Sequence, residues 1–126
     1  MASIASGGEM SRIMLAIKTV FQDQNPVSAL IFDEIDTGVS GEISKKMGFI
    51  MKDLGEKIQT FSITHLPQIA AMGESHFKIY ISDVDCITKT MISRLNENDR
   101  IIEIAKMLEG NNASKSAYTH AKQLLN

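Results

Sequence analysis

Hydrophobic residues recur at helical spacing in two stretches of the chain. In the first stretch, which follows Gly8, the apolar stripe consists of Met10, Ile13, Met14, Ile17, Val20 and Phe21. This spacing predicts a helix with one face against a core, closed by Asn25-Pro26. In the second stretch the stripe consists of Ile43, Met47, Ile50, Met51 and Leu54. A second helix that faces the core is therefore expected.

Two short apolar runs alternate with these helices and are typical of strands. The first, residues 28–32, is almost entirely apolar, which predicts a strand covered on both faces. The second, residues 58–63, ends just before Thr64 and His65. Pro67 then suits the first turn of a short helix that extends to Ala71. The order of strand, helix, strand and helix predicts two parallel strands.

The second half of the chain combines a hairpin pattern with two further helices. Residues 77–82 and 87–95 flank Asp83-Val84-Asp85, which predicts an antiparallel hairpin added to the sheet. Two helical stripes follow, the first ended by Gly110; they consist of Ile101, Ile104, Ala105 and Leu108, then Ala117, Ala121, Leu124 and Leu125. We expect an α/β fold: a three-layer lobe of parallel strands, an antiparallel hairpin and C-terminal helices.

Length and charge narrow the class of protein. The 126 residues suit one domain, and a formal net charge of −2 offers no overall basic surface for nucleic acid. The single cysteine, Cys86, excludes an internal disulfide and fits a reducing cytoplasm. No apolar run approaches the roughly 20 residues that span a bilayer. Residues 1–3 lack the features of a signal peptide and are interpreted as a cloning remnant, so the expected domain covers residues 4–126.

Ser6-Gly7-Gly8-Glu9 opens the first predicted helix and is a candidate phosphate-binding segment. The first N–H groups of a helix are unpaired, the helix dipole is positive there, and glycine lets an anion approach closely. A serine followed three residues later by glutamate is also a capping box, and two glycines before a helix also serve as a hinge. The segment alone leaves these alternatives open.

Asp33-Glu34 follows the first predicted strand directly, at the end where open α/β sheets bind ligands. Asp33 is a candidate ligand for Mg²⁺, which takes few protein ligands and keeps several waters. Glu34 is a candidate to polarise a water for in-line attack on a γ-phosphate. The alternative is a pair of solvated acids at the start of a loop.

The three histidines differ in their sequence surroundings. His65 ends the second predicted strand, where it can donate a hydrogen bond to a phosphoryl oxygen. A loop histidine without chemistry is the alternative. His76 and His120 have no acid or cysteine partner at ligand spacing, so neither is assigned a role.

The order of these three motifs resembles that of the ATP-binding-cassette ATPases, in which they are the signature motif, the Walker B motif and the switch histidine. The longer strings are similar to the RecN family of bacterial DNA repair proteins, which is related to the SMC proteins. Those strings are residues 5–12 (ASGGEMSR), 31–41 (IFDEIDTGVSG) and 64–72 (THLPQIAAM). The resemblance extends from about residue 4 to the last helix.

The resemblance implies a P-loop NTPase head of the cassette or SMC type, with ATP and Mg²⁺ as cofactors of the complete head. Asp33 would support Mg²⁺, Glu34 would activate water, and His65 would sense the γ-phosphate. The γ-phosphate of an ATP held by the opposite subunit would be bound by Ser6, Gly7, Gly8 and Glu9. The loop that would cross the dimer interface consists of Asp36, Thr37, Gly38, Val39, Ser40 and Gly41; in many cassette ATPases an aspartate occupies the position of Ser40.

One motif of such a head is missing from the printed chain. None of the eight glycines is followed by lysine, so there is no lysine-bearing phosphate loop, or Walker A motif. The chain resembles the C-terminal half of a head. We therefore expect that on its own it neither binds ATP tightly nor hydrolyses it. The exposed edge left in its sheet would favour self-association.

The resemblance also implies partners. These are the N-terminal head half with the Walker A motif, a second head in an ATP-dependent dimer, and DNA through the full-length protein. No membrane partner is expected, and the full-length protein would be associated with the nucleoid in the bacterial cytoplasm.

Three interpretations remain at this point. The leading one is a head fragment from a protein that repairs DNA double-strand breaks by recombination. The alternative is a fragment of another cassette ATPase, such as the nucleotide-binding subunit of a transporter. The sequence context of Arg12, the loop Thr37-Gly38-Val39-Ser40-Gly41 and the string Leu66-Pro67-Gln68 favour the first. The third is a non-catalytic interaction module whose motifs are only helix caps and loop acids.

Overall fold

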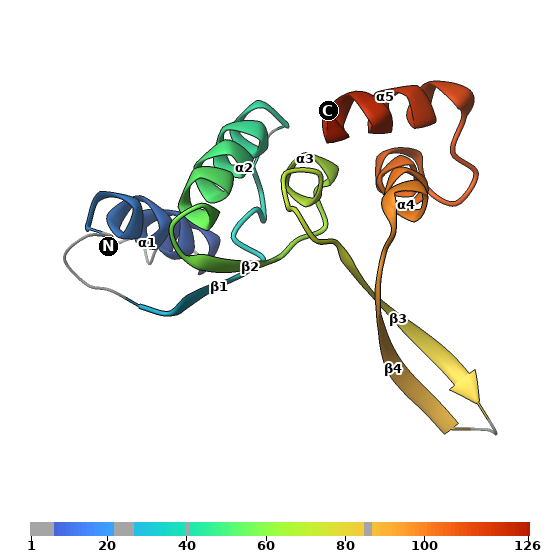
Figure 1. Ribbon diagram of the computed structural model, residues 1–126, viewed down its shortest axis with the longest axis horizontal. Coiled ribbons are helices and arrows are strands. Elements are labelled where there is room, and N and C mark those ends of the chain that lie inside the picture. Colours follow the sequence, from blue (N-terminus) through green and yellow to red (C-terminus); the bar gives the residue numbers. More distant parts are fainter. Residues whose placement is uncertain (1–6, 22–26, 40, 85–86) are drawn as a thin grey trace, which may run out of the picture. The chain divides into compact units, whose positions relative to one another are not determined.

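The computed structural model describes residues 7–21, 27–39, 41–84 and 87–126 (Figure 1). They form two compact units, an N-terminal unit that ends at Met72 and a C-terminal unit that begins at Gly73. The chain length alone favours one domain. The hydrophobic spacing does not reveal the division, because it reports which face of an element is buried and not which element covers it. Within the described ranges, no helix is both long and apolar enough to cross a membrane.

The N-terminal unit contains two parallel strands and three helices. Its elements in order are α1 (Gly7–Phe21), β1 (Ala29–Asp33), α2 (Gly41–Gly55), β2 (Gln59–Ile63) and α3 (Pro67–Ala70). The strands pair in parallel from Ala29 opposite Gln59 to Asp33 opposite Ile63. The predicted strand–helix–strand–helix order is confirmed, with element ends within one or two residues of the expected positions.

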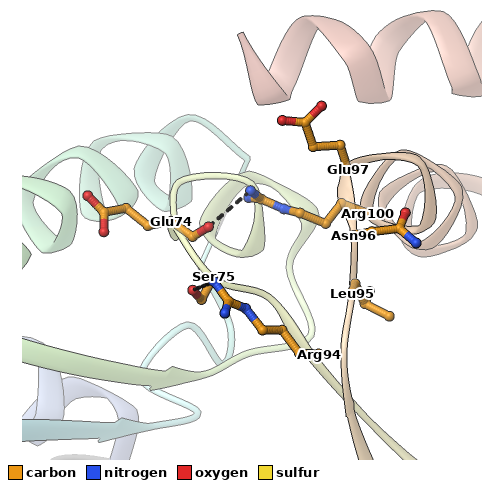
Figure 2. A pocket seen from close by; sticks show the side chains of 7 residues that line it. All are labelled: Glu74, Ser75, Arg94, Leu95, Asn96, Glu97 and Arg100. Atoms are coloured by element: carbon orange, nitrogen blue, oxygen red, sulfur yellow. Dashed lines mark hydrogen bonds between the residues drawn. The ribbon is translucent and has the colours of Figure 1, made fainter.

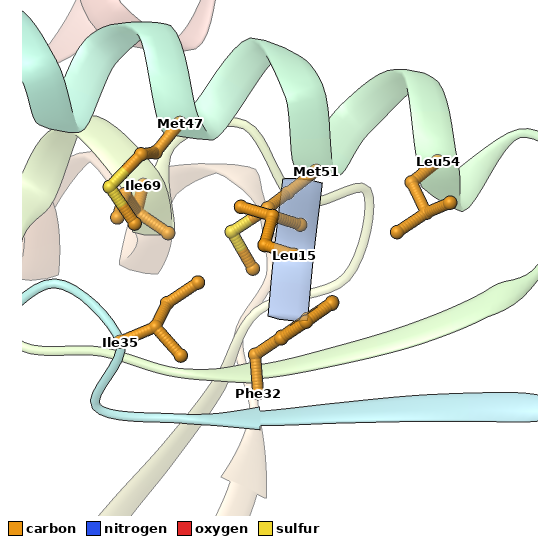
Figure 3. Packing of buried hydrophobic residues seen from close by; sticks show 7 residues of the cluster. All are labelled: Leu15, Phe32, Ile35, Met47, Met51, Leu54 and Ile69. Atoms are coloured by element: carbon orange, nitrogen blue, oxygen red, sulfur yellow. The ribbon is translucent and has the colours of Figure 1, made fainter. Parts of the chain in front are cut away.

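The core of this unit lies on one face of the β1–β2 sheet (Figure 3). It consists of Leu15, Phe32, Ile35, Met47, Met51, Leu54 and Ile69. Phe32 points into this core, whereas its neighbour Ile31 is 70% exposed. The prediction that residues 28–32 are covered on both faces is therefore wrong for the described residues, which place helices on one side only. The third layer of the expected lobe stays a prediction.

Helix α1 packs through a different residue from those predicted. Leu15 is buried, while Ile13, Met14 and Ile17 of the predicted stripe are exposed. Residues 13–17 are all apolar, so every side of the helix carries hydrophobic groups and the spacing does not select one. The side chains of the remaining stripe residues, Met10, Val20 and Phe21, and the predicted helix end at Asn25-Pro26, lie outside the described part.

Helix α2 buries part of the predicted stripe and two small residues in addition. Met47, Met51 and Leu54 are buried as expected, but Ile43 and Ile50 are exposed. Ser44 and Gly48 complete the buried face. A Cβ atom on Gly48 would lie 3.0 Å from Met72 Cγ and 3.3 Å from the Gln68 carbonyl oxygen. The missing side chain at position 48 thus allows α3 to pack closely against α2.

The C-terminal unit consists of a hairpin and two helices. Strands β3 (Phe77–Val84) and β4 (Ile87–Arg94) pair antiparallel, from Phe77 opposite Arg94 to Val84 opposite Ile87. They form a sheet of their own, so the hairpin is confirmed but is not hydrogen-bonded to β1 or β2. Cys86 lies outside the described residues. The α/β class with parallel strands, an antiparallel hairpin and C-terminal helices is confirmed.

Helices α4 (Glu97–Glu109) and α5 (Lys115–Leu125) begin at capping side chains and pack through small residues. Asn96 Oδ1 accepts from the Asp99 N–H at 2.9 Å, and Ser114 Oγ accepts from the Ala117 N–H at 3.3 Å. Gly110 ends α4 with a φ of 85°, a conformation that glycine adopts without strain. The buried positions of the pair are Ile104, Ala105, Ala117 and Ala121, which are four of the eight predicted stripe residues. The other four, Ile101, Leu108, Leu124 and Leu125, are partly buried.

Candidate functional site

The acidic pair lies at the carboxyl end of β1, where both side chains are exposed. Asp33 is the last residue of the strand, and Glu34 follows it. The Glu34 N–H donates to the Ile63 carbonyl oxygen at 3.0 Å, which extends the pairing with β2 by one residue. Glu34 has a φ of 47°, a conformation that costs energy for any residue with a side chain. The backbone is thus strained at the residue predicted to activate water.

A tight turn holds Glu34 in this conformation. Its carbonyl oxygen accepts from both the N–H of Thr37, at 3.3 Å, and the hydroxyl of Thr37, at 3.0 Å. Arg12 of α1 donates through one guanidinium nitrogen to the carbonyl oxygens of Ile35, at 3.3 Å, and Thr37, at 3.2 Å. These bonds attach α1 directly to the loop that follows the acidic pair.

Thr64 and His65 follow β2 and are linked to the same loop through Asp36. The Thr64 hydroxyl donates to Oδ2 of Asp36 and accepts from the Leu66 N–H at 3.0 Å. His65 is exposed, and its Nδ1 lies 3.9 Å from Oδ1 of Asp36. Asp36 itself is only 1% exposed. The loops after β1 and β2 are therefore joined by side chains as well as by strand pairing.

The glycine-led segment begins α1 as predicted. Gly7 and Gly8 are its first two residues, and Glu9 lies exposed in the first turn. Arg12, which contacts the loop after β1, lies one helical turn beyond Gly8. Ser6 of the predicted phosphate-binding segment and Ser40 of the predicted interface loop lie outside the described residues.

Parallel pairing of β1 and β2 brings the acids and the histidine to one edge of the sheet. Asp33 is paired with Ile63, so the residues that follow each strand emerge side by side. Asp33, Glu34 and His65 are exposed there and open to a ligand, whereas Asp36 is buried behind them. In the predicted interface loop, Thr37 and Gly38 are also exposed, whereas Asp36 is buried and Val39 packs against the core.

Hard oxygen ligands are the chemistry that Mg²⁺ prefers, and the exposed carboxylate of Asp33 fits it. Among the described residues, no three His, Cys, Asp or Glu side chains gather as a ready metal cage. A single carboxylate is sufficient where phosphate oxygens and water complete the coordination of the ion.

Sequence reasoning missed the residues that support this edge. Arg12 and Thr64 were not predicted to take part, and Asp36 was predicted only as a loop residue. Their contacts join residues 25 and 28 positions apart, which no local pattern reports. The one sequence feature that could have identified Asp36 as a supporting residue was its position two residues after Glu34, on a loop that must be held in place if the acids are to be positioned.

A concave region lies within the C-terminal unit, away from the predicted site residues in the sequence (Figure 2). Arg100 donates to the carbonyl oxygens of Gly73, at 2.6 Å, and Glu74, at 3.3 Å, while Arg94 donates to Ser75 Oγ at 3.0 Å. Both guanidinium groups thus fasten the segment before β3. Glu74 and Glu97 line the same cavity of about 520 Å³, so its positive charge is largely offset.

His76 belongs to this second unit and is not part of the predicted site. Burial and the positive charge of Arg100 lower the pKa of its imidazole, with a smaller lowering from Lys78 and an opposing effect of Glu103. Lys78 and Glu103 form an ion pair at 2.5 Å. His120 is exposed on α5. Neither histidine lies near the acidic pair in the sequence, and no role is assigned to either.

The chain is similar to curated proteins of known name. It is 40% identical over 125 residues to the DNA repair protein RecN of Halalkalibacterium halodurans and 38% identical to that of Haemophilus influenzae, with 99% of this chain covered in each case. It is 43% identical over 122 residues to RecN of Xylella fastidiosa strain 9a5c, with 97% covered. The chain spans about a fifth of the length of these relatives, 22% in each. No family model matches it.

A solved structure shares the fold. It comes from work on the structural biochemistry of ATP-driven dimerization and DNA-stimulated activation of SMC ATPases. The TM-score is 0.53 at 25% sequence identity, and the match covers 79% of this chain and 60% of the solved chain. The arrangement of parallel strands, hairpin and C-terminal helices is therefore that of part of an SMC ATPase.

Proposed function

This chain belongs to the RecN family of DNA repair proteins, and on that premise we propose that residues 4–126 form the C-terminal lobe of an ATP-hydrolysing head. The lobe supplies the signature segment, the Walker B acids and the switch histidine. A further part of the protein, with a lysine-bearing phosphate loop, supplies the cradle for the β-phosphate. The complete protein acts in recombinational repair of DNA double-strand breaks.

Each candidate residue has one task in this proposal. Glu34 accepts a hydrogen bond from the attacking water and orients it toward the γ-phosphate. His65 contacts a γ-phosphoryl oxygen, and Asp33 holds Mg²⁺, which when bound neutralises charge on the phosphate oxygens. Ser6, together with Gly7, Gly8 and Glu9 in the first turn of α1, binds the γ-phosphate of a nucleotide held by a second head.

The geometry at the edge of the β1–β2 sheet carries this proposal. Asp33, Glu34 and His65 emerge beside one another, they are exposed, and Glu34 occupies a strained backbone conformation fixed by the Thr37 turn. Backbone strain of this kind persists where the surrounding contacts enforce it, and it concentrates at functional sites. Two solvated acids at the start of an ordinary loop would not need it.

The exposed face of the same sheet supports the need for a complementary part. Ile31, Phe61 and Ile63 lie on the side opposite the core, and each is about half exposed or more. A bare apolar sheet face of this kind favours association. We infer that the complementary head part covers it, and that the chain self-associates through this sheet when that part is missing.

The remaining partners follow from the same assignment. Two heads bind each other in the presence of ATP, because each signature segment completes the nucleotide site of the other. The loop of residues 36–41 lies at that interface. DNA is engaged by the full-length protein, which acts at the nucleoid in the bacterial cytoplasm and has no membrane partner.

The test is Glu34→Gln in the complete protein. We expect turnover to fall by about 10²–10⁴-fold, because the amide cannot act as the base, while ATP binding is retained. The variant should accumulate as an ATP-bound dimer, which size-exclusion chromatography with light scattering detects. Glu56 is an exposed glutamate directly after α2, and Glu56→Gln is the matched control that should turn over normally. Normal turnover in Glu34→Gln would remove Glu34 from its role.

A further inference from the structure

Among the described residues of the N-terminal unit, Asp36 is the one buried carboxylate, and only one of its oxygens has a hydrogen-bond partner. Its Oδ2 accepts the hydroxyl proton of Thr64. Its Oδ1 is buried, and no hydrogen-bond donor among the described residues reaches it. Buried polar atoms are rarely left without a partner, because water is lost and nothing replaces it. An orphaned carboxylate oxygen next to a candidate site therefore needs an explanation.

The candidate hydrogen-bond donor to Asp36 Oδ1 is the ring of His65. Its Nδ1 lies 3.9 Å from Asp36 Oδ1, beyond hydrogen-bonding distance but within the range of an ion pair. Thr64 fixes the other oxygen of the carboxylate, so Oδ1 cannot turn away freely. The side chain of His65 is 62% exposed, so little packing opposes a closer approach of Nδ1. Bonds of this type are often long without substrate and shorten when it is bound.

We propose that Asp36, held by Thr64, is a positioning residue for His65. Asp36 Oδ1 accepts from Nδ1–H of the ring, which fixes the tautomer and directs Nε2 away from the protein toward the bound phosphoryl group. Nε2 can donate to a phosphoryl oxygen only after the ring takes up a second proton from solvent, and Asp36 then supplies the counter-charge of the imidazolium. The contact with phosphate depends on the function proposed above, whereas the Asp36–His65 contact does not.

The Asp36–Thr64 pair also links the two halves of the candidate site. Asp36 lies two residues after Glu34, and Thr64 directly precedes His65. A hydrogen bond between them therefore couples the position of the acid to that of the histidine. Arg12 fixes the same loop from the other side through Ile35 and Thr37. The position of His65 thus follows that of the Glu34 loop.

The direct test is the tautomer of His65, read from ¹⁵N chemical shifts of its ring in this chain at a pH where the ring is neutral. A His65→Gln variant identifies its signals among the three histidines. With Asp36 present, we expect Nδ1 to carry the proton. In Asp36→Asn, the amide oxygen accepts from Thr64 and its NH₂ group faces the ring, so the proton moves to Nε2. The matched control, Asp53→Asn on the exposed side of α2, should leave the tautomer unchanged.

A second pair of variants covers the case in which Asp36→Asn does not fold. Thr64→Val removes the hydroxyl that pins the carboxylate, so the fraction of His65 with a protonated Nδ1 should fall. Thr64→Ser keeps the hydroxyl and should restore that fraction. Equal tautomer populations in the native chain and in either disrupting variant would overturn the proposal.

Activity of the complete protein separates this proposal from the function on which it partly rests. Asp36→Asn should lower kcat by about 10–100-fold with little change in KM for ATP, as expected when a residue orients a reacting group. A tautomer change with unaltered kcat would overturn the catalytic part alone. If Glu34→Gln turns over normally while the tautomer depends on Asp36, the proposed function fails and the Asp36–His65 contact stands.

Discussion

The two units of the chain differ in what they do with polar groups. The N-terminal unit buries the carboxylate of Asp36 and the hydroxyl of Ser44, and it strains the backbone at Glu34. The C-terminal unit follows local rules: both of its helices have capping side chains, and their buried positions are apolar. Residues that depart from local preferences in a stable fold are often functional, and the energy that they cost is offset by stabilising contacts elsewhere in the structure. Among the described residues, the strained Glu34 and the buried Asp36 both lie on the loop that follows β1.

The two sheets resemble each other in leaving an apolar face uncovered. In β3 and β4, alternate residues form one such face: Phe77, Ile79, Ile81 and Ile92, each more than half exposed. In β1 and β2 the corresponding residues are Ile31, Phe61 and Ile63. A two-stranded sheet with a bare apolar face is marginal in water. A partner that covered either face would therefore stabilise the unit to which it belongs.

The largest expected difference separates the two faces of the β1–β2 sheet. Phe32→Ala removes a buried ring from the core and should cost about 3–5 kcal/mol of unfolding free energy. Phe61→Ala removes the same ring from the opposite face, where it is 51% exposed. Its cost should be below about 1 kcal/mol, because less contact is lost. Urea unfolding of the two variants measures both; equal losses would show that the outer face is packed in solution.

A smaller effect on stability is expected in the C-terminal unit, where stability should depend on pH through His76. The pKa of His76 lies below its usual value of 6.5, chiefly through burial, so the unfolded chain binds a proton more readily than the folded one. This contribution to stability is complete above pH 6.5 and is lost as the pH falls from 6.5 toward the folded pKa. We expect the urea midpoint to decrease over that range in the native chain.

His76→Gln should flatten this part of the pH profile, since the amide does not titrate. His120→Gln, on the exposed surface of α5, is the matched control and should keep the native profile. A profile that is unchanged in His76→Gln would show that other groups determine the response.

Most helices and strands could be predicted from the hydrophobic spacing. Which face of each helix is buried could be predicted only in part. The stripes in α4 and α5 include all four buried residues of these helices, although the other four stripe residues are only partly buried. In α1 the five consecutive apolar residues 13–17 concealed Leu15 as the core contact. In α2 the buried residues Ser44 and Gly48 are small or polar and carry no hydrophobic signal. The division at Gly73 had no local signature either.

The candidate site shows the same limit. Asp33, Glu34 and His65 could be predicted to share an edge, because they end parallel strands in a recognisable order. The contacts of Arg12 with Thr37 and of Thr64 with Asp36 could not, because each joins segments far apart in the sequence. The backbone conformation of Glu34 likewise depends on the Thr37 turn and has no signal in the residue itself.

The central claim is that this chain holds the hydrolytic acid and histidine of a nucleotide site that another part of the protein completes. The most direct measurement is Mg-ATP hydrolysis by this chain alone and after co-expression with the N-terminal head part of a RecN protein. We predict no turnover by the chain alone and clear turnover by the complex. Hydrolysis by the isolated chain, or a correctly assembled complex that does not hydrolyse ATP, would contradict the claim.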